Sequence, residues 1–241
     1  MKIAVISDIH GNLEAFRQVL ADIDSSGTDT VISLGDNIGY GPDSEQVIRL
    51  IRERNIPSVM GNHEWAVADT GNMDWFNPVA RLSLQKTMSM MSDESLDFVC
   101  NMKSSISFFE SRFVHGFPPD MINTYVFQVS NHRMKKNFRW LNERICFVGH
   151  THLMEIISFD GRIIKHALLE KGITELSEHQ KYIINTGSVG QPRDGNNNAK
   201  YVIWDTSANN IEVRFIPYNI AAVAEKIVAL GLPRAHADRL W

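Results

Sequence analysis

The chain has 241 residues, of which 44% are hydrophobic and 22% charged, and its formal net charge is −4. This length suffices for one sizeable α/β domain, and the composition is ordinary for a soluble globular protein. The acidic balance, with no basic run longer than Lys135-Lys136, argues against nucleic acid as a partner.

The cysteines and the N-terminus indicate where the protein resides. Two isolated cysteines, Cys100 and Cys146, fit a reducing compartment better than a disulfide framework. The first apolar run covers only four residues before Ser7, which is too short for a signal peptide or a membrane span. We therefore expect a cytoplasmic protein with no membrane partner. With no repeat or linker in the sequence, a single domain over residues 1–241 is expected.

The first third of the chain alternates apolar strands with amphipathic helices. This β-α-β-α-β order favours parallel strands joined by crossover helices. Asp43 or Ser44 is a suitable N-cap for the second helix. The predicted strands span residues 2–7, 30–36 and 56–64, and the predicted helices span 12–24 and 42–55.

The rest of the chain divides into a helical and a strand-rich part. Residues 65–101 are predicted to be mostly helical, with a helix start at Pro78. Asp160-Gly161 is a strong hairpin turn signal, and a final helix is expected at about 219–230, before Gly231. The further predicted strands lie at 104–109, 111–116, 144–149, 155–166 (a hairpin), 182–187, 200–205 and 211–216.

Polar side chains follow the predicted strands at the points where these strands end. In an open parallel sheet the carboxyl ends of the strands meet at one edge, where ligands bind. We therefore expect one site there. The side chains in question are Asp8, His10, Asp36, Asn62, His63, His115, His150 and His152.

The types of these residues favour metal chemistry. Carboxylate, imidazole and amide groups without cysteine disfavour a structural zinc site. They suit a mixed nitrogen and oxygen site for Mn, Fe, Zn, Co or Ni, with positions left for water. There are more ligands than one ion needs, so two ions sharing a carboxylate are expected. Such two-metal sites typically hydrolyse phosphoesters.

Five short motifs, in this order along the chain, resemble those of the calcineurin-like metallophosphoesterases. Each alone would be a weak signal, but the ordered series is specific, and the resemblance covers about residues 3–205. The segment NTGSVGQPRDG, 185–195, also looks like the small prokaryotic phosphodiesterase-like branch. The five motifs are Asp8-Ile9-His10, Gly35-Asp36, Gly61-Asn62-His63-Glu64, His115-Gly116 and Gly149-His150-Thr151-His152.

The resemblance implies a fold and a cofactor. The implied fold is α/β, with two mixed β-sheets packed as a sandwich flanked by helices and a helical insertion at about 65–101. The implied cofactor is a pair of divalent ions, with Mn²⁺ as the first choice. By resemblance, Asp8, His10, Asp36 and His152 hold the first metal. Asp36, Asn62, His115 and His150 hold the second, with Asp36 as the bridge.

The histidine pair at the end of one strand has to serve two metals. Alternate residues of a strand point to the same face, and neighbours to opposite faces. The segment Gly149-His150-Thr151-His152 is therefore expected to be a loop that directs one histidine to each metal.

His63 lies outside the implied ligand set. The resemblance implies that it protonates the leaving oxygen or stabilises the transition state. The protein phosphatase branch carries an Asp-Arg pair after the bridging Asp and an Arg before Gly-Asn-His. Here Gly39-Tyr40 and Met60 stand at these positions, which argues against a Ser/Thr protein phosphatase. Arg193 and Tyr40 remain as candidate substrate-binding residues.

Two functions stay open at this point. A phosphodiesterase for a small phosphorylated substrate is the first, and a dinucleoside polyphosphate hydrolase of the diadenosine tetraphosphate type is the alternative. A non-catalytic scaffold would have lost ligands, and none is lost. Stacking aromatic side chains near the site would favour the alternative; the candidates are Trp65, Trp75, Phe76 and Phe117.

Other polar residues have ordinary interpretations. Glu64 is interpreted as a helix cap or as the partner of a cation. The histidines outside the motifs are interpreted as surface or packing residues; these are His132, His166, His179 and His236.

Overall fold

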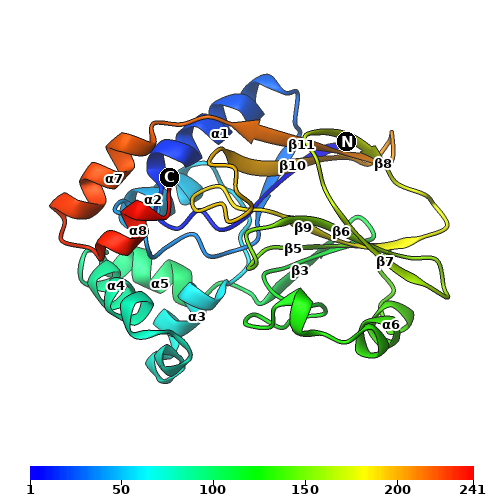
Figure 1. Cartoon of the computed structure of the whole chain (residues 1–241), viewed down its shortest axis with the longest axis horizontal. Helices are drawn as coiled ribbons and strands as arrows, with labels where there is room; N and C mark the ends of the chain where they lie inside the picture. Colours follow the sequence, from blue (N-terminus) through cyan, green and yellow to red (C-terminus); the bar gives the residue numbers. More distant parts are fainter.

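The computed structural model describes residues 1–241 and contains two mixed β-sheets that face each other (Figure 1). The first sheet has the strand order β2-β1-β10-β11-β8. Its strands are β1 (Lys2–Ile6), β2 (Thr30–Ser33), β8 (Gly172–Glu175), β10 (Ala199–Asp205) and β11 (Asn210–Ile216).

The second sheet has the order β3-β4-β5-β9-β6-β7. Parallel pairs join β1 to β2 in the first sheet and β4, β5 and β9 in the second, while the other pairs are antiparallel. The predicted sandwich of two mixed sheets is confirmed. The strands are β3 (Ser105–Phe108), β4 (Ser111–Val114), β5 (Ile145–Val148), β6 (Met154–Phe159), β7 (Ile164–Leu168) and β9 (Lys181–Thr186).

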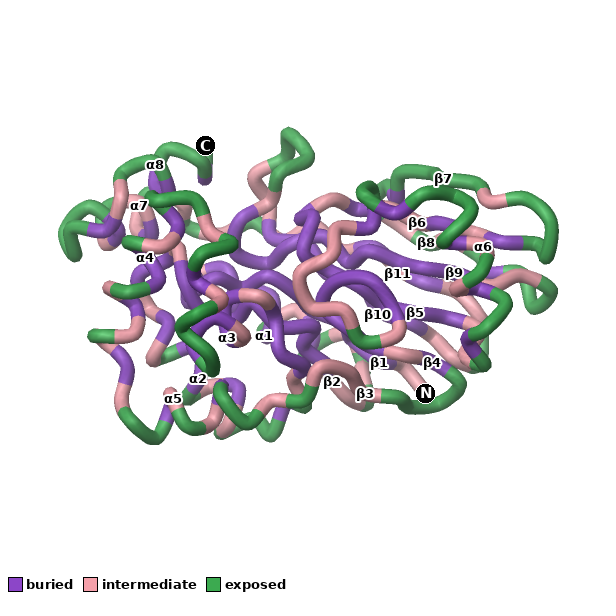
Figure 2. Tube along the Cα trace, turned by 90° about the horizontal axis from the view of Figure 1, so that it is seen from below, coloured by how far each residue is buried: buried purple, intermediate pink, exposed green.

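Strand β5 shows how the layers are packed. Ile145 and Phe147 belong to the core between the sheets, whereas Cys146 and Val148 belong to the core on the opposite face. Successive side chains of a strand point to opposite faces, and a strand that is buried on both faces has a continuous apolar sequence. Figure 2 shows the buried strands as the centre of the molecule.

Helices cover the outer faces of the two sheets. Helix α1 (Leu13–Ser25) packs Phe16 and Val19 against Ala4 of the first sheet, and each such burial contributes about 1.5–3 kcal/mol. Helix α6 (Asn131–Trp140) covers the second sheet. The remaining helices are α2 (Ser44–Glu53), α3 (Asn62–Ala68), η1 (Thr70–Trp75), α4 (Pro78–Ser89), α5 (Asp93–Cys100), η2 (Val126–Gln128), α7 (Ile220–Ala229) and α8 (Arg234–Asp238).

The helical insertion is confirmed. Residues 65–101 form the end of α3, η1, α4 and α5, and α4 begins at Pro78 as predicted. Together with α7 and α8, these helices gather at one end of the sandwich (Figure 1). No helix combines the length and the apolar character that crossing a bilayer requires.

The prediction of local structure from the sequence was wrong for one strand and missed one strand and two helices. The predicted strand at 56–64 is reduced to isolated parallel bridges at Ser58 and Val59, because the chain enters α3 at Asn62. Strand β8 was not predicted, since it has only four residues and begins with a glycine. Helices α6 and α8 were also missed; α6 buries only Met134 and Phe138, which leaves a weak apolar periodicity.

Candidate metal centre

The loops that follow β1, β2 and β5 turn sharply at the residues of the motifs. Five of these residues have a left-handed backbone, which costs a non-glycine residue about 1–3 kcal/mol and is concentrated at functional sites. The expected loop after β5 is confirmed by this geometry. The residues are Asp8 (φ 54°), His10 (φ 50°), Asp36 (φ 51°), His150 (φ 68°) and His152 (φ 61°).

Glu64 holds the loop that carries Asp36. Its carboxylate is fully buried and accepts hydrogen bonds from the backbone N–H groups of Asp36 (2.9 Å), Asn37 (2.7 Å) and Gly61 (2.9 Å). The last of these bonds closes the first turn of α3, so the interpretation as a helix cap is confirmed. Gly35 is required here, because a Cβ atom would lie 2.3 Å from the nitrogen of Gly61.

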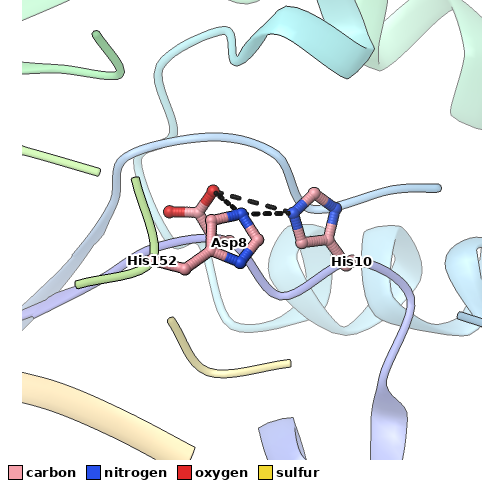
Figure 3. A group of neighbouring side chains, drawn as sticks. All are labelled: Asp8, His10 and His152. Atoms are coloured by element: carbon pink, nitrogen blue, oxygen red, sulfur yellow. Dashed lines mark hydrogen bonds and ion pairs between the residues drawn. The ribbon is translucent and has the colours of Figure 1, made fainter. Parts of the chain in front are cut away.

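Asp8 presents one carboxylate oxygen to the cluster. Its Oδ2 accepts hydrogen bonds from the Ser7 hydroxyl (2.5 Å) and from the backbone N–H of His150 (3.0 Å). Its Oδ1 has no hydrogen-bond partner. This oxygen lies 3.1 Å from His152 Nε2 and 3.7 Å from His10 Nε2, and the three side chains face one another in Figure 3.

Asp36 is held in the same way. Its Oδ1 accepts a hydrogen bond from the backbone N–H of His63 at 2.9 Å. Its Oδ2 lies 3.3 Å from His115 Nε2 and 3.8 Å from His10 Nε2. Burial alone would raise the pKa of Asp36, but the surrounding histidines, His115 first, lower it below its usual value. The carboxylate is therefore ionised, and its Oδ2 lies between two sets of histidines.

Backbone carbonyl groups orient three of the histidines. His10 Nδ1 donates to the carbonyl of Ile38 (3.2 Å), and His115 Nδ1 donates to that of Leu34 (2.8 Å). His152 Nδ1 donates to the carbonyl of Gln191 (2.5 Å). Since a carbonyl only accepts, Nδ1 carries the proton and the neutral ring directs the lone pair of Nε2 into the cluster, as in metal-binding histidines.

Two of these Nε2 lone pairs, on His10 and His152, face each other at 3.2 Å, and that of His115 faces Asn62 Oδ1 at 3.1 Å. His150 Nδ1 also lies 3.1 Å from His115 Nε2. Such pairs repel unless a proton or another cation lies between them. The donor set therefore fits divalent metal ions with nitrogen and oxygen ligands.

Burial and the neighbouring charges shift the pKa values of the histidines in different directions. Burial would lower the pKa of His115, but Asp36 raises it to about 9. Burial lowers the pKa of His150 to about 3 and that of His152 to about 4. In the absence of metal the cluster thus takes up a proton at His115, and the other two rings stay neutral.

Donor atoms within 4.8 Å of one another form three overlapping groups. We call Asp8, His10 and His152 the first donor group, and Asp36, His115 and His150 the second. The third group contains His10, Asp36 and His63. The structure brings every predicted ligand into this cluster, and Asn62 joins the second group through its 3.1 Å contact with His115.

His63 is buried beside the donor groups with both ring nitrogens unpaired. The ring packs against the rings of Tyr40, His10 and Phe76 at centroid distances of 4.5, 4.8 and 4.9 Å. Burial lowers the pKa of His63 well below its usual value. The ring is therefore neutral and has an N–H group to donate to another molecule.

Tyr40 and Arg193 lie at the edge of the cluster. Burial raises the pKa of Tyr40 to about 12 against the opposing effect of the Arg193 guanidinium, so the phenol stays protonated. The same guanidinium acts on the pKa values of His152 and Tyr125. Arg193 is solvent-exposed and donates to Gln191 Oε1 at 2.9 Å. Tyr40 thus contacts the rings of His10 and His63, and Arg193 is close enough to act on Tyr40, Tyr125 and His152.

Two aromatic residues beside the cluster were not placed there from the sequence. His236 was interpreted as a surface or packing residue, and it is a packing residue: it is buried, with its ring 4.7 Å from that of Tyr40 and its Nε2 unpaired. Tyr125 stacks on the ring of His150 at 3.8 Å. Neither residue belongs to a motif, and no local pattern in the sequence indicates that either one lies here.

A cleft of about 150 Å³ opens beside the second donor group. Asn62 and His150 line one end of it, and three of the predicted aromatic residues, Trp65, Trp75 and Phe76, also line it. The fourth prediction was wrong. Phe117 is buried in the core between the second sheet and α6, because it follows β4 on the face that this helix covers.

Comparison with known proteins decides the family. The model of the calcineurin-like phosphoesterase superfamily domain matches residues 1–209. This chain belongs to the calcineurin-like phosphoesterase superfamily. The phosphoesterase is thus a hydrolase of phosphoesters in a divalent-metal-dependent family, and its Asp and His donor groups could bind such metals.

Similar proteins extend over the whole chain. The phosphoesterase is 36% identical to the protein MJ0912 of Methanocaldococcus jannaschii over 99% of this chain and 97% of that one. It is 34% identical to a metallophosphoesterase from Sphaerobacter thermophilus, whose crystal structure superimposes with a TM-score of 0.84 over 100% and 98% of the two chains. The hypothetical protein PH1004 of Pyrococcus horikoshii shares the fold, with a TM-score of 0.79 at 15% identity over 100% and 97%.

Proposed function

We propose that the phosphoesterase hydrolyses phosphodiester bonds of small phosphorylated substrates at a centre of two divalent metal ions. Mn²⁺ is the first choice, and Fe, Zn, Co or Ni are alternatives. The observation that carries this proposal is the position of Asp36. Its Oδ2 lies within 3.8 Å of Nε2 atoms from both donor groups, those of His10 and His115. Two-metal sites with ions ~3.5–4 Å apart are typical of phosphoester hydrolysis.

The residues of the two donor groups would hold the ions. Bound divalent ions act as Lewis acids and lower the pKa of a water molecule towards neutrality. The protein contributes the fixed directions of the ligands, because backbone groups hold both carboxylates and three imidazoles. The first ion would have Asp8, His10, Asp36 and His152 as ligands, and the second Asp36, Asn62, His115 and His150.

His63 is proposed to act on the leaving oxygen. Its Nε2 lies 4.0 Å from Asp36 Oδ2, and neither ring nitrogen has a partner within the protein. Since its pKa is low, the ring is neutral and its N–H donates a hydrogen bond to the developing negative charge. Protonation of the leaving oxygen would instead start from the imidazolium form, which becomes the neutral ring as the bond to phosphorus breaks. These two roles differ in their dependence on the leaving group.

The charges around the cluster favour diesters over monoesters. A monoester dianion needs more positive charge than a diester monoanion. Tyr40 stands where the phosphatase branch carries an arginine, and it remains neutral. Arg193 is the cation that acts on Tyr40 and His152, and it can grip a phosphate through two parallel hydrogen bonds. We therefore expect phosphodiesters or phosphoanhydrides to be preferred.

A dinucleoside polyphosphate is the second candidate substrate. The aromatic residues of the cleft beside His150 favour it, since bases stack on such side chains. A Ser/Thr protein phosphatase has less support, because the arginine positions are occupied by Tyr40 and Met60. A non-catalytic scaffold has the least support, because all eight motif side chains are retained.

A substrate screen with several divalent metals tests this proposal. The panel contains aryl phosphodiesters, matched monoesters and diadenosine tetraphosphate. Chelation is expected to abolish hydrolysis and Mn²⁺ to restore it, with about two ions per chain by elemental analysis. Undiminished turnover by metal-free protein would contradict the metal centre, and a clear preference for monoesters would contradict the charge argument.

A further inference from the structure

The cleft beside the second donor group has an aromatic wall. Trp65 comes from α3, Trp75 ends η1, and Phe76 follows it. All three line the cleft, and Tyr125 lines it from the loop that precedes η2. The side chain of Trp75 is 74% exposed. An exposed tryptophan on the rim of a cleft is a surface on which a planar ring can stack.

Two amide side chains, those of Asn77 and Asn123, also line the cleft. Asn77 Oδ1 accepts a hydrogen bond from the backbone N–H of Ala80 as the cap of α4 (3.0 Å), which leaves its NH₂ group to donate. An amide offers donors and an acceptor, the pattern that the edge of a nucleobase also presents. A purely hydrocarbon ring would not use these groups.

The lining of the cleft also includes proposed metal ligands. Asn62 and His150 line it, and the ring of Tyr125 stacks on that of His150 at an angle of 16°. A ring that enters between the aromatic side chains is therefore next to the second donor group. This arrangement suits a molecule that joins a planar ring to a phosphate.

The volume of the cleft limits what it can hold. At about 150 Å³ it is smaller than the roughly 300–1,000 Å³ that encloses a drug-sized ligand. It can accept one ring system and cannot enclose two nucleosides. The cleft can therefore hold only one of the two groups that a diester carries on its phosphorus atom.

We propose that this cleft binds the nucleobase of a nucleoside phosphodiester or phosphoanhydride, with stacking on Trp75 and hydrogen bonds to Asn77 and Asn123. This inference rests on the proposed phosphodiesterase function and adds the substrate class to it. The helical insertion thereby acts as the specificity element of the enzyme. The cleft has no room for the other group on phosphorus, which therefore extends outside it.

Esters that differ in one substituent test the proposal. The Mn²⁺-loaded enzyme is assayed with the methyl esters of adenosine 5′-phosphate and ribose 5-phosphate, and with benzyl methyl phosphate, by following the products in phosphorus NMR. The adenosine ester is expected to have the highest kcat/KM. Equal values for the adenosine and ribose esters would overturn the base site, and equal values for the adenosine and benzyl esters would overturn the assignment to a nucleobase.

Two tryptophan variants separate the cleft from general effects. Trp75→Ala is expected to reduce the preference for adenosine over ribose by about 5- to 150-fold, because stacking of a base on an aromatic side chain contributes ~1–3 kcal/mol. Trp140→Ala is the matched control, since Trp140 lies on α6 and is 71% exposed. An unchanged preference in Trp75→Ala, or an equal loss in both variants, would overturn the proposal.

Binding without turnover keeps this test independent of the proposed activity. Calorimetric titration of the metal-free wild type with AMP and with ribose 5-phosphate compares the two ligands directly. Tighter binding of AMP, weakened by Trp75→Ala, supports the base site even if no ester is hydrolysed, in which case only the phosphodiesterase proposal fails. Hydrolysis of the ribose ester at the same rate as the adenosine ester, with equal binding of both ligands, removes the base site and leaves the phosphodiesterase.

Discussion

The metal centre and the aromatic cleft are neighbours, but the protein builds them in opposite ways. The aspartates and histidines of the donor groups are at most 5% exposed, and backbone hydrogen bonds direct them from the ends of strands. The cleft is lined by side chains of the helical insertion and of a loop, and Trp75 on its rim is 74% exposed. The side chains of the donor groups are thus fixed in one geometry, whereas the cleft is open to solvent.

This difference follows from what each region has to do. Metal ligands must hold their directions within narrow limits, which rigid strand ends and a supporting shell of hydrogen bonds provide. A stacking surface tolerates small displacements, because every base has a planar face. The two regions meet at His63, which packs against Phe76 of the insertion and lies beside Asp36. Under the two proposals, the substrate would be recognised in the cleft and cleaved at the donor groups.

The largest effect is expected from the shared carboxylate. Asp36→Asn keeps the volume but removes the charge that both donor groups use, so both metals should be weakened and hydrolysis should fall to the background rate. Asp8→Asn removes a ligand of the first group only and should mainly weaken one metal. Elemental analysis and kcat are measured on both variants. Two tightly bound metals and a normal rate in Asp36→Asn would exclude the bridging role.

The next effect concerns the chemical step. His63→Gln should retain both metals and lose roughly 10²–10⁴ in kcat, the range of a lost general acid. The loss should be smaller for substrates with good leaving groups, which need no proton. A series of aryl diesters measures this dependence. An equal loss across the series would assign His63 to electrostatic stabilisation of the transition state.

A stability effect tests how strongly the metal centre depends on its supporting hydrogen bonds. Glu64→Ala leaves three buried backbone donors unpaired and should lower the free energy of unfolding by about 3 kcal/mol or more. Urea denaturation of the metal-free protein measures it.

The control for this effect is Glu45→Ala. Glu45 also accepts a backbone hydrogen bond, from Ser92, but its side chain is 13% exposed and lies on α2, outside the donor groups. The Glu45→Ala variant should lose less stability than Glu64→Ala and should still bind its metals. Equal losses of unfolding free energy in the two variants would contradict a special dependence of the Asp36 loop on Glu64.

The smallest effect is expected at the open edge. Arg193→Lys keeps the charge but loses the two parallel hydrogen bonds of a guanidinium, so kcat/KM on a phosphodiester should fall about tenfold with unchanged metal content. Arg162→Lys, in the exposed turn between β6 and β7, is the matched control. If both variants behave like the wild type, Arg193 does not contact the substrate.

The sequence alone indicated which side chains gather at the proposed metal centre, because each of them lies in a motif, and the structure brings these side chains together. The side-chain direction of His152 depends only on the short turn Gly149-His150-Thr151-His152, so the sequence of this turn was enough to predict it. The sandwich of two mixed sheets was also predicted, through the resemblance that these motifs carry. The helical character of 65–101 followed from local composition and from Pro78.

Only the tertiary structure decided which other residues surround the centre. His236 contacts Tyr40 from α8 near the C-terminus, and Tyr125 contacts His150 from the loop before η2, so both contacts join segments that are far apart in the sequence. Phe117 was assigned to the cleft but belongs to the core beneath α6. Local sequence patterns determine the backbone turns, and thereby the direction of the side chains on them. Contacts between distant segments depend on how whole layers pack, which no short stretch of sequence encodes.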